Sequence, residues 1–343
     1  MKIKSKFLKL SIIILLVCFS VSAYFVYQIF YGPSTSLKHT KYVYLEYNDN
    51  IQSLENILIE ECGLKHPYLF KQLAHRMNLS KWMKQGRYTI EPKMTLVELL
   101  KTFRQGKLKT VNITIKPLST LDKFTEMCGN KLEPDDTAFM NVMNNSVLLD
   151  SLGFNKATIY ALLLPDTYNF YWHTSPVELI HRLLKEYKLY WDSSKLKQCE
   201  SIGLNPIEVT TLASIVSKET NKYDEMPMVA GMYVNRLKIN MPLQADPTVK
   251  FALNQPNLRR ILNVHLQVES PYNTYLNVGL PPGPICIASK QSLEAVLNYH
   301  PSDFLFMCAK EDFSGYHAFA KDYTTHLKNA KRYQQALNVK NIR

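Results

Sequence analysis

Cysteine is scarce in this chain and never occurs in a spacing typical of metal binding. The 343 residues include six cysteines, with no CxxC pair and no cluster of histidine and cysteine. Zinc sites and thiol redox centres are built from such clusters, so the sequence predicts neither a metal nor another cofactor. A disulfide between Cys286 and Cys308 and buried free thiols remain equally compatible with the sequence.

The chain also lacks internal repeats, low-complexity linkers and any recognised nucleic-acid-binding motif. Hydrophobic residues make up 46% of it, which is ample for a packed core in one large or two small domains. The net charge of +12 suits an anionic membrane surface, an acidic polymer or merely a soluble basic surface. We therefore expect no nucleic-acid partner.

A single long apolar segment lies near the N-terminus. Four lysines at positions 2, 4, 6 and 9 precede it, and its densest part runs from Leu10 to Tyr31. That length crosses a hydrocarbon core, and the cationic flank predicts a cytoplasmic tail at residues 1–9, a transmembrane helix at 10–31 and the remainder outside. A cleaved signal peptide stays open as the alternative, because Val21-Ser22-Ala23 suits a signal peptidase.

The region from about residue 40 to 108 has the pattern of a small mixed module. Alternation predicts strands near residues 43–47 and 86–90, and periods of three and four predict helices at 51–61, 66–77 and 94–104. A further strand is expected at 111–115, and residues 117–198 are mostly helical in pattern.

The most informative segment is the predicted helix that begins at Ile207. Its apolar residues recur at three- and four-residue steps, and Glu219 continues that stripe one turn beyond Ile215. Desolvation raises the pKa of a carboxyl on an apolar face, which makes it able to donate a proton near neutral pH. The alternative is a glutamate at the rim of the stripe, capped by a lysine or a backbone amide.

Polar and aromatic segments follow this helix. A second helix is expected from Asp224 to Lys238. After it, Asp246 and Thr248 on either side of a proline predict a rigid turn instead of a helix. The later segments 270–275, 279–285 and 315–319 carry polar and aromatic groups typical of a sugar-binding site.

Several of these segments together resemble a known family. The motifs ASIVSKET, VAGMYVNRL, MPLQADPTVKFAL, SPYNTYLNVGLPPGPI and GYHAFAKDYTTH are similar, in order and spacing, to those of the YceG-like family of endolytic murein transglycosylases. The resemblance implies an α+β fold, with a LysM-like module at 40–108 and a mixed α+β catalytic domain at 109–343. The module would bind glycan or act as a spacer above the membrane.

The resemblance also implies the site. Glu219 would be the catalytic residue, and where many relatives have a second glutamate two positions earlier this chain has Ser217. Asp166 would be either a second carboxylate or the cap of a turn. The remaining implied site residues bind substrate and are Gln244, Asp246, Thr248, Asn273, Tyr275, His317 and Phe319.

The implied activity is a lyase reaction that needs a single carboxylate. It would cut the bond between N-acetylmuramic acid and N-acetylglucosamine in nascent peptidoglycan and leave 1,6-anhydro ends. The implied place is the inner membrane, as a single-pass protein with its catalytic domain in the periplasm, working on glycan strands beside cell-wall synthases. A non-catalytic peptidoglycan-binding scaffold is the alternative. A pyridoxal-phosphate lyase, an old label of this family, is disfavoured by the membrane anchor.

Overall fold

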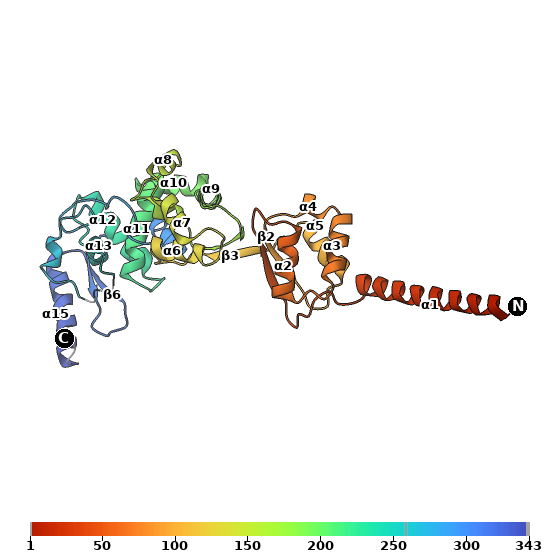
Figure 1. The fold of residues 1–343 in the computed structure, drawn as a ribbon. Coiled ribbons are helices and arrows are strands. Elements are labelled where there is room, and N and C mark those ends of the chain that lie inside the picture. Colours follow the sequence, from red (N-terminus) through yellow and green to blue (C-terminus); the bar gives the residue numbers. More distant parts are fainter. Residues whose placement is uncertain (1, 257, 259, 341–343) are drawn as a thin grey trace. The chain divides into compact units, whose positions relative to one another are not determined.

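The computed structural model of the chain describes residues 2–256, 258 and 260–340. The outermost ends of the predicted tail and catalytic domain, Met1 and residues 341–343, lie outside the described residues. The chain forms two compact units, one from the residues up to Val111 with Asn169–Thr174, the other from Asn112–Tyr168 and the residues from Ser175 onward. Both are mostly helical with two-stranded sheets, which confirms the predicted α+β class (Figure 1).

The N-terminal helix α1 (Lys2–Phe30) contains the predicted apolar segment. Its apolar part, Leu8–Phe30, has 23 residues and a mean hydropathy of 2.4, and none of it is buried. At the helical rise it is about 35 Å long, enough to cross a hydrocarbon core of about 30 Å. The helix has the length and composition of a single-pass anchor or a signal sequence.

The first unit is a small module of helices built around one antiparallel strand pair. Strands β1 (Lys41–Leu45) and β2 (Gly86–Ile90) form this pair, and Val43 lies opposite Tyr88, both completely buried. The predicted strands and helices all occur, and one short helix, α4, was not predicted. The helices are α2 (Ile51–Cys62), α3 (Pro67–Arg76), α4 (Leu79–Trp82) and α5 (Leu96–Arg104).

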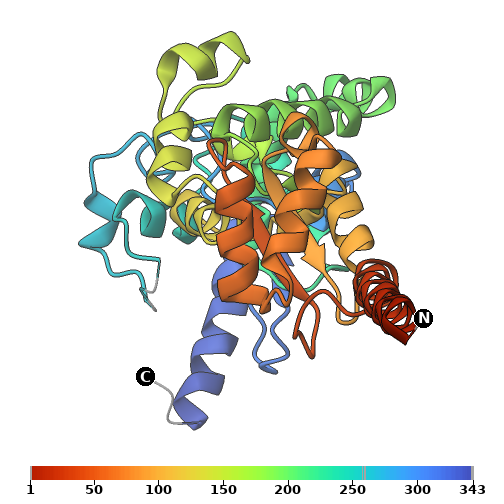
Figure 2. The ribbon, with the colours of Figure 1, turned by 45° about the vertical axis from the view of Figure 1, so that its right-hand side comes forward.

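The predicted strand near residue 111 is β3 (Thr110–Thr114), which pairs with β4 (Thr167–Tyr171). Between these strands lie α6 (Leu121–Gly129), α7 (Asp136–Met143), α8 (Ser146–Ser151) and the 3₁₀ helix η1 (Ile159–Leu162). The second unit continues with α9 (Pro176–Tyr190), α10 (Ser193–Ile202), α11 (Pro206–Glu219), α12 (Met226–Lys238), α13 (Asp246–Ala252), η2 (His265–Gln267), α14 (Lys290–Leu297), β5 (Phe306–Ala309), β6 (His317–Ala320) and α15 (Tyr323–Val339). Figure 2 shows the same ribbon turned by 45°.

Helix α11 forms the centre of the second unit and packs against α12 and α14. The sequence predicted an apolar stripe along this helix, and the structure buries every residue from Val209 to Ser217, including those outside the stripe. Thr210, Thr211 and Ser214 tolerate burial because their hydroxyls bond to carbonyls within the helix, as Thr210 Oγ1 does to the Pro206 carbonyl at 2.7 Å. The helix is therefore buried at the centre of the core, and its last residue is Glu219.

The predicted rigid turn at Asp246 is wrong, because α13 begins there. Proline has a fixed φ and no N–H, which disrupts a helix interior but suits its first turn, where the amide has no helical partner. Pro247 occupies that first turn. The consequence is that Asp246 stands at the start of a helix.

Close contacts fix the elements around the end of α11. Gly231 of α12 lies against the His300 carbonyl, where a Cβ would come within 2.3 Å of the oxygen, so only glycine permits this approach. The hairpin of β5 and β6 pairs Ala309 with His317. Both α12 and the hairpin have residues beside Glu219.

Candidate active site

Glu219 is the last residue of α11 and is partly buried. The helix ends after it because Thr220 adopts an extended conformation, with φ −140° and ψ 144°. Its Oε1 accepts a hydrogen bond of 2.8 Å from the hydroxyl of Tyr233, a fully buried residue of α12. Oε2 has no hydrogen-bond partner among the described residues.

Burial raises the pKa of Glu219 to about 7. The Tyr233 hydrogen bond opposes this shift because it stabilises the carboxylate, whereas the negative charge of Asp246 adds to it. The charges of His317 and Lys250 act in the lowering direction. Glu219 thus has the raised pKa that its position in the sequence predicts, and at neutral pH both of its protonation states are populated.

A polar cavity of about 240 Å³ opens beside Glu219. Of the predicted site residues, five line it together: Glu219, Gln244, Asp246, Tyr275 and His317. They come from the end of α11, the start of α13 and the loop before it, the loop after η2 and the hairpin. Residues more than 90 positions apart in the chain therefore converge on one small polar space.

Two of these side chains are bonded to each other. The Tyr275 hydroxyl donates to Asp246 Oδ1 at 2.6 Å, and Asp246 is exposed. The burial of the phenol and the negative charge of Asp246 both hold the pKa of Tyr275 above its usual value. Tyr275 therefore stays a neutral hydrogen-bond donor at the cavity wall.

Arg236 of α12 is buried beneath the cavity. Its Nε donates to the Leu305 carbonyl at 2.6 Å and its Nη1 to the Leu243 carbonyl at 2.8 Å, with a longer contact of 3.4 Å to Gln244 Oε1. Gln244 has a φ of 51°, in the left-handed region. Arg236 thus ties the loop that carries Gln244 to the chain that enters β5.

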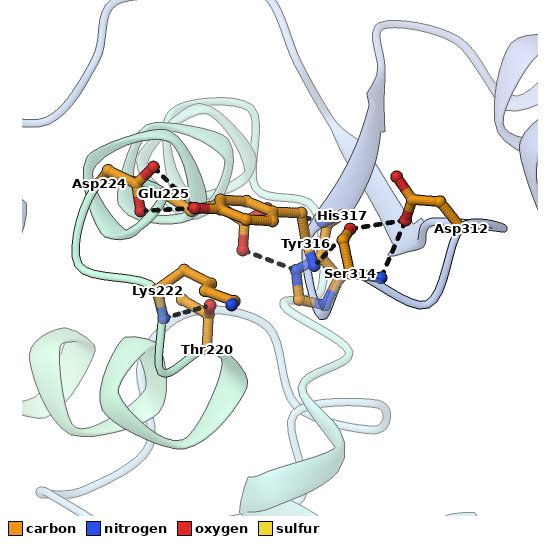
Figure 3. Close-up of polar contacts among 8 residues, drawn as sticks. All are labelled: Thr220, Lys222, Asp224, Glu225, Asp312, Ser314, Tyr316 and His317. Carbon is orange, nitrogen blue, oxygen red and sulfur yellow. Dashed lines mark hydrogen bonds and ion pairs between the residues drawn. The ribbon is translucent and has the colours of Figure 1, made fainter.

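His317 reaches the cavity from the start of β6 and is held by a buried carboxylate. Glu225, just before α12, accepts the backbone N–H of His317 at 2.6 Å and its ring Nδ1 at 2.9 Å. Only 4% of the Glu225 side chain is exposed. Its neighbour Asp224 accepts from the Tyr316 hydroxyl at 2.9 Å, and Figure 3 shows both carboxylates facing the hairpin. This arrangement leaves His317 Nε2 without a partner among the described residues.

Three predicted binding residues do not line the cavity. Thr248 and Asn273 are completely buried, with the Thr248 hydroxyl bonded to the Ala245 carbonyl at 2.7 Å and the Asn273 amide to the Leu266 and Val268 carbonyls at 2.9 Å. Phe319 packs against Phe304 with the two rings tilted and 5.5 Å between ring centres. Their contacts shape the walls of the site.

Asp166 and Ser217 also lie apart from the cavity lining. Asp166 pairs with Lys290 at 2.6 Å, which lowers the pKa of this carboxyl, and accepts the Thr167 amide next to it. It thus leads into β4 instead of capping a turn between helices. Ser217 is buried and donates to Ser292 at 2.6 Å. Neither supplies a second carboxylate to the cavity.

The cysteines are free thiols, so the possible disulfide between Cys286 and Cys308 is not formed. Within the described part of the chain, no three side chains of His, Cys, Asp or Glu gather in a way that could hold a metal ion.

Sequence reasoning missed three contributors to the site: Tyr233, Arg236 and Glu225. All are buried polar residues on or next to α12, within the motif VAGMYVNRL or just before it. The available signal was a tyrosine and an arginine three residues apart within an apolar helix, a spacing that puts both on one face.

Comparison with known proteins places the chain beside a family model and several relatives. The model of the YceG-like family matches residues 43–332. An endolytic murein transglycosylase of Bacillus subtilis is 32% identical over 224 residues, a match that covers 65% of this chain and 59% of the relative. An endolytic murein transglycosylase of Streptococcus pneumoniae is 28% identical over 339 residues, a match that covers 88% of this chain and 60% of the relative. The chain thus spans about three-fifths of the length of these curated relatives. A crystal structure of a yceG-like protein from Listeria monocytogenes matches with a TM-score of 0.56 at 25% identity, over 85% of this chain and 99% of that one.

Proposed function

The chain belongs to the YceG-like family, and we propose that it is a membrane-anchored peptidoglycan lytic transglycosylase that cuts within nascent glycan strands. One observation carries the proposal. A single partly buried carboxyl, Glu219, has a pKa raised to about 7 and faces a polar cavity without another ionisable carboxyl in hydrogen-bond contact with it. That is the property required of one group that must first donate a proton and then accept one.

The chemistry follows from that pKa. Protonated Glu219 gives its proton to the oxygen that links N-acetylmuramic acid to N-acetylglucosamine, and the bond from that oxygen to C1 breaks. The resulting carboxylate takes the proton of the muramoyl 6-hydroxyl as its oxygen attacks C1, which closes a 1,6-anhydro ring. No water is consumed, and Glu219 ends in its starting state. Since Tyr233 occupies Oε1, we assign the moving proton to Oε2.

A hydrolase would need a second catalytic carboxyl. Ordinary glycosidases use two carboxyls, about 5–5.5 Å apart for retention or about 6.5–9.5 Å apart for inversion. Asp246 is the other carboxylate of this cavity, but it is exposed and bonded to Tyr275. We assign it to substrate orientation together with Gln244, Tyr275 and the free Nε2 of His317.

The remaining predicted residues support these groups in the proposal. Thr248 and Asn273 hold the backbone around α13 and the loop before Tyr275, and Phe319 packs the hairpin that carries His317. These three residues hold the walls of the site in place, so replacing them would disturb the positions of the substrate-binding residues and leave the proton-transferring group itself intact.

The anchor and module complete the proposal. Residues 1–9 stay in the cytoplasm, the apolar helix crosses the membrane, residues 40–108 form a LysM-like module and residues 109–343 the catalytic domain on the outer side. The exposed apolar surface of α1 supports this topology. Peptidoglycan strands are the proposed substrate, and cell-wall synthases are the proposed neighbours.

Product analysis tests the function. The full-length protein is incubated with uncrosslinked glycan strands, and the new ends are weighed by mass spectrometry, since an anhydro end is lighter than a reducing end by one water. Glu219→Gln should lower the rate by about 10² to 10⁴. Asp246→Asn should cause a partial loss and Asp166→Asn little loss. Equal inactivation by Asp246→Asn would make Asp246 a second catalytic carboxyl.

A further inference from the structure

A second cavity, of about 330 Å³, lies next to the Glu219 cavity within the same unit. At two places, two residues that are adjacent in the sequence line different cavities. Lys218 lines the second cavity and Glu219 the first, and the same holds for Pro247 and Asp246 at the start of α13. Because adjacent residues diverge into the two spaces at two separate places, the cavities are neighbours along the junction of α11 and α13.

The second cavity has an apolar floor and a cationic edge. Ile285 and Cys286 are buried at its base. Phe251, whose ring lies tilted against that of Tyr272 with 4.7 Å between ring centres, adds an aromatic wall. Two lysines, Lys218 and Lys250, stand at the cavity. Within the described part of the chain, neither lysine has a carboxylate within 4.0 Å.

One acidic residue, Asp122, also lines this cavity. It belongs to the first turn of α6, where the helix dipole favours a negative charge. The lining therefore keeps a net positive charge of one from two lysines and one aspartate. An anionic ligand with small apolar groups fits this combination.

We infer that this cavity binds the stem peptide carried by the muramoyl residue next to the scissile bond, with Lys218 and Lys250 pairing with its carboxylates. The inference rests on the proposed function, because it requires a glycan strand in the adjacent Glu219 cavity. The stem is attached close to the bond to be cut, and it combines alanine methyl groups with free carboxylates. The methyl groups would meet Phe251 and the apolar floor.

The test compares two substrates prepared from one sample. Uncrosslinked glycan strands are used either with their stem peptides or after removal of the stems by an amidase, and full-length protein is assayed on both. The measured quantity is the ratio of kcat/KM on stem-bearing strands to that on stripped strands. The ratio cancels the effect of Lys250 on the Glu219 pKa, which acts on both substrates equally.

We expect the wild-type kcat/KM to be about tenfold higher on stem-bearing strands than on stripped strands, because two modest ion pairs together account for a factor of about ten. The double variant Lys218→Gln/Lys250→Gln should reduce this ratio to about one. Lys197→Gln, which removes an exposed lysine of α10 outside both cavities, should keep the wild-type ratio.

Other outcomes overturn specific parts of this inference. A wild type that cuts both substrates equally, or a double variant that keeps the wild-type ratio, would refute the peptide site while the transglycosylase function stands. A double variant that loses activity equally on both substrates would show that the lysines act on Glu219 instead. A wild type inactive on both would refute the proposed function, and the peptide site with it.

Discussion

Replacing Glu219 by glutamine should stabilise the protein in a pH-dependent way. The pKa of this carboxyl rises from 4.5 to about 7 on folding, so the folded state binds the proton more tightly than the unfolded chain. Wild-type stability then falls as pH rises through 4.5, and the loss saturates above about pH 7. Glutamine cannot ionise and keeps an oxygen for the Tyr233 hydroxyl, so it avoids this loss.

The magnitude follows from the two pKa values. A difference of about 2.5 units corresponds to roughly 3 kcal/mol at full ionisation, of which about 2.5 kcal/mol develops between pH 5 and pH 8. For a unit of this size that is about 5–10 °C in Tm. The advantage of Glu219→Gln over wild type should therefore be small at pH 5 and large at pH 8.

Thermal unfolding of full-length protein in detergent at both pH values measures this directly. Glu200→Gln, an exposed change on α10, is the control and should alter stability little at either pH. A Glu219→Gln variant clearly less stable than wild type at pH 8 would refute the reasoning. It would mean that an ion pair stabilises the Glu219 carboxylate and that burial does not control its pKa.

Changes around the site test how its residues are held. Tyr233→Phe removes the hydroxyl that lowers the pKa of the catalytic carboxyl, so the alkaline limb of the pH profile of kcat/KM should move up by about one unit. Tyr190→Phe is the control, because it removes a similar hydrogen bond to Glu294 outside the cavity and should leave the alkaline limb in place. An alkaline limb that moves down in Tyr233→Phe would contradict the role of Tyr233 in lowering the Glu219 pKa. Glu225→Gln should lower kcat/KM by about tenfold, mainly through KM, because the His317 ring loses its charged acceptor. Asp224→Asn, which affects only the Tyr316 contact, should cost much less, and equal losses would deny His317 its orienting role.

Local patterns predicted the secondary structure well but not the environment of its residues. Periodicity predicted helix α11 and its apolar stripe, but it did not predict that Thr210 and Ser214 are buried too, because their burial depends on hydroxyls bonding within the helix. The turn expected at Asp246 failed for a related reason. A proline can end one helix or lie in the first turn of another, and which of the two occurs depends on the neighbours against which the segment packs.

The site was predictable only in part, for the same physical reason. Glu219 could be found because a carboxyl on an apolar helix is a local signal. Glu225 and Arg236 could not, because their partners His317 and Leu305 lie about 70 to 90 residues away and only the tertiary fold brings them together. Conversely, Thr248 and Asn273 have the residue types of a sugar site but are used for backbone contacts.

The most direct test of the proposed mechanism is the fate of water in the reaction. Glycan strands are cut in water enriched in ¹⁸O, and the new muramoyl ends are examined by mass spectrometry. One carboxyl that serves as acid and then as base predicts anhydro ends without ¹⁸O, produced by the wild type and lost in Glu219→Gln. New reducing ends, formed in place of anhydro ends as the strands are cut, would identify a hydrolase with a second catalytic group, and would contradict a mechanism in which Glu219 acts alone.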